Sequence, residues 1–144
     1  EIWGKKAGMV FQHADESLNL ESTVKEIFSG LKLETTINDL FLLEKLTRIF
    51  NHSVSRSFLA KKVAHLSGGQ KQALNLLRTF LIRPDLIILD EPLNGLDFNR
   101  VKSVLELIAE GCKYGSAILI ISHNEEIVEN IVPATSTWHL STIN

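Results

Sequence analysis

One stretch decides the fold of this chain: Leu86-Ile87-Ile88-Leu89-Asp90-Glu91-Pro92. Four consecutive aliphatic residues predict a parallel β-strand that is buried on both faces, and Pro84 with Asp85 predicts a turn before it. The strand ends in two adjacent carboxylates, Asp90 and Glu91. Ligands of open α/β sheets bind at the carboxyl edge of the strands. The stretch therefore predicts both a core strand and the position of a site.

Companion strands are expected on both sides of this one. Residues 7–11 and 117–121 are short apolar runs that suit buried strands. A helix is expected before the last strand, because apolar residues recur there at helical spacing and Gly115 can end it. Its apolar residues are Val101, Val104, Leu105 and Ile108. Helices that alternate with buried strands indicate an α/β fold with a parallel sheet.

Residues from about 22 to 83 look mainly helical. Thr23 and Glu26 have the spacing of a capping box, which predicts that a helix starts there. Apolar residues at helical spacing predict a second, amphipathic helix across residues 37–50. A third helix is expected after Ser67, where leucines recur at positions 74, 77 and 81.

Composition narrows the class of protein. The chain has 144 residues, of which 44% are hydrophobic and 22% charged, and this balance is typical of soluble globular proteins. The formal net charge is −2 and no basic block stands out, so we expect no direct nucleic-acid partner. Its apolar runs are far shorter than the roughly 20 residues that span a bilayer. Cys112 is the only cysteine, which excludes an intrachain disulfide.

A candidate phosphate-binding turn is the segment Leu66-Ser67-Gly68-Gly69-Gln70. Ser67 can cap the following helix, and glycines let backbone amides approach a ligand closely. Free amides and the positive end of a helix dipole together form an anion site. Taken alone, two glycines before a helix also fit a flexible turn.

The two carboxylates and one histidine are candidates for catalysis. Asp90 offers the oxygen ligand that Mg²⁺ prefers, and Glu91 is placed to orient or deprotonate an attacking water. His123 ends the next strand, in Ile120-Ile121-Ser122-His123, at the same edge of the sheet. Taken singly, the carboxylates also fit a polar turn, and the histidine also fits a cap or a surface residue.

The order and spacing of these motifs resemble the ABC-type ATPase family. In chain order the motifs are Gly8-Met9-Val10-Phe11-Gln12, Leu66 to Gln70, Asp90-Glu91, Asn94-Gly95-Leu96-Asp97 and Ser122-His123. The resemblance implies a P-loop NTPase (RecA-like) core sheet, present in part, with an inserted and mainly helical subdomain. We therefore expect residues 1–144 to form one partial domain. Its helical subdomain would span about 13–83, and its core would span about 1–12 and 84–144.

The resemblance implies an enzyme that hydrolyses ATP with Mg²⁺ to power transport. Gln12 matches the family's glutamine that senses Mg²⁺ and the γ-phosphate. Asp90 matches the aspartate that holds Mg²⁺, and Glu91 matches the catalytic glutamate. His123 matches the histidine that contacts the γ-phosphate. Gln12, Glu91 and His123 are thus the expected catalytic residues, with Asp90 and Gln12 at the metal.

The same resemblance implies partners. Ser67, Gly68, Gly69 and Gln70 match the signature motif, which closes over ATP held by an opposite subunit. Asp97 matches the aspartate at the seam of that dimer. A second nucleotide-binding domain is therefore expected, together with a transmembrane permease that contacts the helical segment 13–65. The expected location is the cytoplasmic face of a membrane.

One family motif is missing. No Gly-x-x-x-x-Gly-Lys-[Ser/Thr] occurs, and Gly4-Lys5-Lys6 lacks the upstream glycine and the hydroxyl residue needed to replace it. We expect an N-terminally truncated domain that is inactive and poorly stable alone. Ser17-Leu18-Asn19 and Thr23-Val24 after Gln12 resemble importer ATPases for peptides or nickel. The alternatives are an ABC ATPase of DNA repair or ribosomes, and a non-catalytic split subunit that completes a partner's ATP site.

Overall fold

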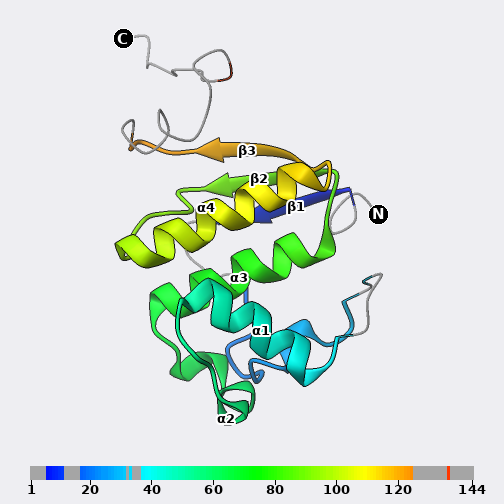
Figure 1. The fold of residues 1–144 in the computed structure, drawn as a ribbon, viewed down its shortest axis with the longest axis vertical. Helices are drawn as coiled ribbons and strands as arrows, with labels where there is room; N and C mark the ends of the chain where they lie inside the picture. Colours follow the sequence, from blue (N-terminus) through cyan, green and yellow to red (C-terminus); the bar gives the residue numbers. More distant parts are fainter. Residues whose placement is uncertain (1–5, 12–16, 32, 34–36, 125–135, 137–144) are drawn as a thin grey trace.

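A three-stranded parallel sheet forms one layer of the fold (Figure 1). The computed structural model describes residues 6–11, 17–31, 33, 37–124 and 136. Within them the strand order is β1-β2-β3, with bounds Ala7–Val10, Leu86–Asp90 and Ala117–Ile121. Both strand pairs are parallel. The three predicted strands and the α/β class are therefore confirmed.

The two faces of the sheet differ in burial. Ile87 and Leu89 of β2 are fully buried on the face that the helices cover. Side chains on the other face remain exposed, with 37% of Leu86, 52% of Leu119 and 47% of Ile121 accessible. The expectation that β2 is buried on both faces is therefore wrong, because the described residues cover only one face.

Two long helices cover the buried face. α3 spans Gly68–Ile82 and α4 spans Phe98–Lys113. Glycines bring them close to their neighbours: a Cβ added to Gly8 of β1 would lie 2.8 Å from Cγ2 of Thr79 in α3. α4 ends where Gly115 adopts a φ of 92°, a conformation that favours glycine. This C-terminal signal was predicted and is confirmed.

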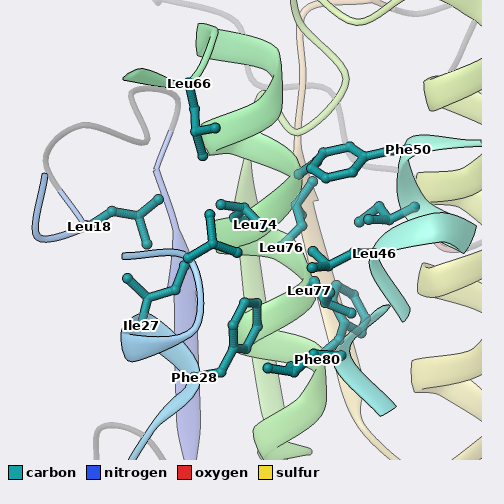
Figure 2. Packing of buried hydrophobic residues seen from close by; sticks show 14 of the residues in the cluster. Leu18, Ile27, Phe28, Leu46, Phe50, Leu66, Leu74, Leu76, Leu77 and Phe80 are labelled. Atoms are coloured by element: carbon teal, nitrogen blue, oxygen red, sulfur yellow. The ribbon is translucent and has the colours of Figure 1, made fainter. Parts of the chain in front are cut away.

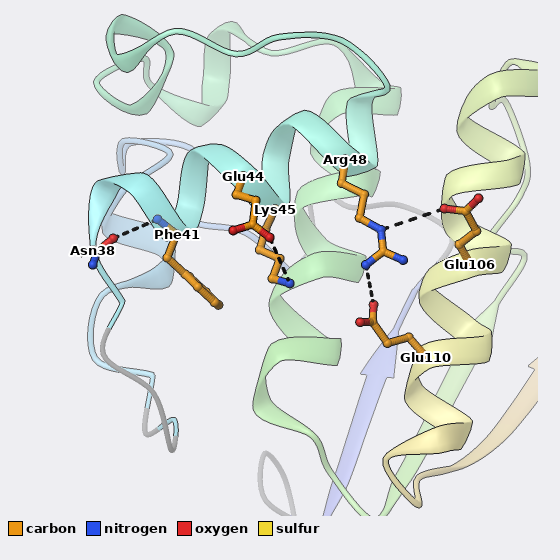
Figure 3. Close-up of polar contacts among 7 residues, drawn as sticks. All are labelled: Asn38, Phe41, Glu44, Lys45, Arg48, Glu106 and Glu110. Atoms are coloured by element: carbon orange, nitrogen blue, oxygen red, sulfur yellow. Dashed lines mark hydrogen bonds and ion pairs between the residues drawn. The ribbon is translucent and has the colours of Figure 1, made fainter.

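A second helical layer packs beneath α3 and includes α1, Asp39–Phe50, and the short α2, Arg56–Leu59 (Figure 1). α1 begins where the Asn38 side chain accepts a hydrogen bond from the Phe41 amide at 2.9 Å (Figure 3). It ends at Asn51, which is left-handed. No helix among the described residues is long and apolar enough to cross a membrane.

α1 is also tied to α4 by charge. Arg48 of α1 contacts Glu110 at 3.0 Å and Glu106 at 3.9 Å, both on α4 (Figure 3). Because these side chains are partly exposed, such pairs contribute at most about 1 kcal/mol each. The ion pairs therefore add little to the stability of the contact between α1 and α4.

The core lies around α3, which is buried along most of its length. Leu74, Leu76 and Leu77 are at most 2% exposed and pack with Phe28 and Leu46 (Figure 2). Burying such a side chain contributes about 1.5–3 kcal/mol relative to leaving it exposed. α3 therefore joins the sheet to the lower helical layer.

The helix predicted at Thr23 is much shorter than expected. The Glu26 side chain accepts a hydrogen bond from the Thr23 amide at 2.7 Å, as the capping spacing predicts. Only a 3-10 helix follows, Glu26–Phe28. The Val24 and Lys25 amides instead donate to the carbonyl groups of a distant segment. Another 3-10 helix, Val63–His65, leads into the start of α3.

Candidate functional site

The predicted site residues gather at one edge of the sheet. β2 and β3 are parallel, so both end at the same edge, and α3 and α4 begin on that side (Figure 1). Asp90 is the last residue of β2, and Glu91 follows it. His123 lies two residues past the end of β3. The topology thus brings together residues that are far apart in the chain.

Glu91 is held by the segment that follows β3. Its Oε1 accepts from the His123 amide at 2.8 Å and lies 2.6 Å from Nδ1 of the His123 ring. Its Oε2 accepts from the Ser122 hydroxyl at 3.2 Å. The Glu91 side chain is only 13% exposed. Both carboxylate oxygens are therefore occupied by donors from one short segment.

These contacts set the charge of Glu91. Burial raises the pKa of the Glu91 carboxyl, but hydrogen bonds from His123 and Ser122 lower it by more, so the pKa lies below its ordinary value. The carboxylate is therefore ionised at neutral pH and acts as an acceptor. Glu91 is therefore in the form that can accept a proton.

The backbone of Glu91 is strained. Its φ is 47°, in the left-handed region that residues other than glycine rarely adopt. Its amide donates to the Ile121 carbonyl at 2.9 Å, which extends the pairing of β2 with β3 by one residue. The strain turns the side chain toward the end of β3. Strained residues of this kind cluster at functional sites.

Asp90 has the chemistry of a magnesium ligand. Its side chain is partly buried and makes no hydrogen bond or ion pair with another described residue. No group of three or more His, Cys, Asp or Glu side chains in the described part could hold a metal ion. Mg²⁺ bound with nucleotides usually takes only one or two carboxylates and keeps several waters. A single orphan carboxylate at this edge fits that type of site.

The start of α3 has the geometry of an anion site. Ser67 caps the helix: its hydroxyl accepts from the Gln70 amide at 3.2 Å, and the Gln70 side chain accepts from the Ser67 amide at 3.0 Å. The amides of Gly68 and Gly69 have no hydrogen-bond partner among the described residues. The helix dipole adds positive charge there. Gln70 thus completes the cap rather than pointing outward.

Asp97 begins α4. Its Oδ1 accepts from the Arg100 amide at 3.0 Å, and its Oδ2 lies 3.3 Å from Nε of the Arg100 side chain. No role was predicted for Arg100 from the sequence, although its spacing of three residues from Asp97 is a signal for such a pair. No contact with Glu91 was predicted for Ser122, the residue before His123. Gln12, the remaining predicted site residue, lies outside the described residues.

Comparisons with known proteins agree with these motifs. Residues 1–94 match the family described as ABC transporter. A putative ABC transporter ATP-binding protein of Methanosarcina acetivorans is 33% identical over 126 residues, which cover 83% of this chain and 42% of that protein. A methionine import ATP-binding protein of Protochlamydia amoebophila is 33% identical over 128 residues, covering 88% and 37%.

A solved structure shares the fold. The ATP-binding subunit of an ABC transporter matches with a TM-score of 0.71 and 27% identity, covering 88% of this chain and 52% of that one. The chain spans about two fifths of the length of the two curated relatives.

Proposed function

This chain belongs to the family of ABC transporter ATP-binding proteins, and on that premise we propose that it forms part of an enzyme that hydrolyses ATP to drive membrane transport. One observation supports this most: the ionised carboxylate of Glu91 lies beside Asp90 and within hydrogen-bond distance of His123. Phosphoryl transfer to water needs a base, a metal ligand and a group that donates a hydrogen bond to the γ-phosphate, and all three would lie at this edge of the sheet.

Glu91 is the proposed base. It would orient a water whose oxygen forms a bond to the γ-phosphorus while the bond to the ADP oxygen breaks. The proton of that water would pass to the Glu91 carboxylate and then to solvent. His123 now occupies Oε1 of Glu91, yet its side chain is 79% exposed and free to turn. Turning its ring to a γ-phosphate would leave Oε1 with the His123 amide as its only donor, so that this oxygen could also accept from the water.

Asp90 is the proposed magnesium ligand, through water, and Gln12 is proposed to contact the same ion. Bound Mg²⁺ neutralises charge on the phosphate oxygens. The partly buried Asp90 carboxylate supports this assignment because no other described residue occupies it.

The start of α3 is the proposed contact to ATP held by a second nucleotide-binding domain. The amides of Gly68 and Gly69 and the capped end at Ser67 support it, and Asp97 would lie at the seam between the domains. The sequence has no glycine-rich loop with a lysine to grip the phosphates. We therefore expect these 144 residues alone not to hydrolyse ATP.

Glu91→Gln in the full-length natural protein tests the proposed base. We expect turnover to fall by about 10²–10⁴-fold, the usual contribution of general base catalysis, while ATP still binds. Glu106→Gln is the control, because Glu106 is an exposed side chain on α4 that pairs with Arg48 of α1 and with none of the predicted site residues. Turnover is measured as phosphate release at saturating ATP, and binding with a fluorescent ATP analogue.

The outcomes separate the competing functions. An active wild type with an equally active Glu91→Gln variant would contradict the role of Glu91. Stimulation by nucleic acid would favour an ATPase of repair or ribosomes over a transporter. If the wild-type protein never hydrolyses ATP, the remaining interpretation is a non-catalytic subunit.

We also propose that a transmembrane permease contacts the helical segment 13–65, at the cytoplasmic face of the membrane, and that transport is inward. A groove of about 490 Å³ between the Glu26–Phe28 turn and the start of α1 supports this contact. Its lining includes Phe28, Leu31 and Leu33 and also Lys25 and Asp39, which form an ion pair at 2.7 Å. A groove lined by apolar, polar and charged side chains suits an amphipathic helix. The name of the methionine import relative supports the inward direction.

Leu33→Glu tests this contact. A carboxylate in the groove would have to be desolvated against the permease, so we expect the permease no longer to co-purify. Leu40→Glu is the matched control, because Leu40 is 67% exposed on α1 and does not line the groove. Equal retention of the permease by both variants would place the contact elsewhere.

A further inference from the structure

Arg100 joins the loop after Glu91 to the first turn of α3. We propose that this side chain is a positioning residue that couples the two ATP sites of the dimer. The inference rests on the proposed function, in which Glu91 serves the chain's own ATP and the start of α3 serves the partner's. Arg100 lies where the two parts of one chain meet.

The contacts of Arg100 are specific. Its Nε lies 3.3 Å from the Asp97 carboxylate, and its side chain is only 22% exposed. Its Nη1 lies very near Gly69: a Cβ added to this glycine would be 2.6 Å from Nη1 of Arg100. The same Cβ would be 3.8 Å from Cδ2 of Leu96. A guanidinium can therefore pack against the first turn of α3 only because residue 69 has no side chain.

The electrostatic energy of the Arg100 guanidinium at the first turn of α3 depends on which charged groups lie beside it. A guanidinium against the positive end of a helix is unfavourable by itself. The ion pair with Asp97 offsets that cost and holds the side chain in place. When an anion binds at the start of α3, the guanidinium is favoured there. When Asp97 turns to a partner subunit, the guanidinium loses its anchor.

The position of Arg100 in the chain gives the contact a consequence. The loop of residues 92–97 begins directly after Glu91, whose side chain is held by Ser122 and His123. The same loop ends at Asp97, which binds both the backbone and the side chain of Arg100. A shift of Glu91 during hydrolysis would therefore move Arg100 and the first turn of α3. That turn is the part that contacts the partner's nucleotide.

Arg100→Ala in the full-length natural protein tests the coupling. We expect turnover at saturating ATP to fall about 5-fold or more, at the lower end of the usual coupling between sites, with the KM for ATP changed less than about twofold. Arg48→Ala is the matched control. It also removes an arginine that forms ion pairs, here with Glu106 and Glu110 of α4, but Arg48 lies away from the site. Arg48→Ala should keep wild-type turnover.

A second variant checks the contact itself. Gly69→Ala would push away the far end of the Arg100 side chain, so its effect should include the loss of the Arg100 contact. In the Arg100→Ala background, Gly69→Ala should then slow turnover less than it does in the wild type. Additive losses, wild-type turnover in Arg100→Ala, or an equal loss in Arg48→Ala would each overturn the coupling. Absence of ATPase activity in the wild type would instead overturn the proposed function, and this inference with it.

Discussion

Gly111 is the position where the structure reverses an ordinary rule of helix stability. Replacing glycine by alanine in an exposed helix interior stabilises a protein by about 1 kcal/mol. Gly111 is buried inside α4, however, and an added Cβ would lie 2.6 and 2.9 Å from two ring carbons of Phe80. It would also lie 3.3 Å from Cδ1 of Ile118 in β3. The methyl group therefore has no free space.

The size of the effect follows from two opposing terms. Phe80 is only 7% exposed, so its ring cannot move into solvent. Overpacking of this kind costs about 1–3 kcal/mol, against the gain of about 1 kcal/mol from helix propensity. We expect Gly111→Ala to lower the free energy of unfolding by about 1 kcal/mol.

Urea unfolding measures this change. The urea concentration at the midpoint should fall while the m-value stays constant, because the substitution does not change how much surface unfolding exposes. Phe80→Leu provides the matched background, since it removes the ring that the methyl group meets. In that background Gly111→Ala should be neutral or stabilising. Stabilisation by Gly111→Ala in the wild-type background would refute the close packing of α4 on α3.

Two further predictions concern the site. Ser67→Ala removes the hydroxyl that caps α3 and should lower the free energy of unfolding by about 1 kcal/mol; thermal unfolding beside the exposed control Ser53→Ala checks it, and equal midpoints would contradict the cap. The pKa of Glu91 is lowered in the folded state, so its contribution to stability is present above the ordinary glutamate pKa of about 4.3 and is lost as pH falls through the lower folded value. Glu91→Gln should therefore flatten the acid side of the stability–pH curve, and an unchanged acid limb would contradict the hydrogen bonds drawn from Ser122 and His123.

Local signals in the sequence predicted most of the sheet and the long helices. The strand at 117–121 and the cap at Ser67 depend on neighbouring residues, and both are found in the structure. The helix at Thr23 failed because its signal was overridden from a distance. The Val24 amide donates to the Lys61 carbonyl at 2.9 Å, and no periodicity within residues 22–30 reports that partner.

The site was predictable in position but not in its contacts. Parallel strands place Asp90, Glu91 and His123 at one edge, and sequence motifs alone established this. Ser122 and Arg100 were missed because their partners depend on how separate segments approach in space. The roles assigned to the predicted residues remain predictions that the variants above test.

The pairing of β2 with β3 sets the geometry of the candidate base. Asp90 pairs with Ile121, so Glu91 and Ser122 are each one residue past the paired ends and can meet. The φ of 47° at Glu91 costs about 1–3 kcal/mol, which hydrogen bonds from the segment after β3 offset. A slip of one residue between the strands would turn every side chain of β3 to the opposite face. The orientation of Glu91 therefore depends on the neighbouring strand β3. Substitutions that loosen β3 should misplace the Glu91 carboxylate even when Glu91 itself is unchanged.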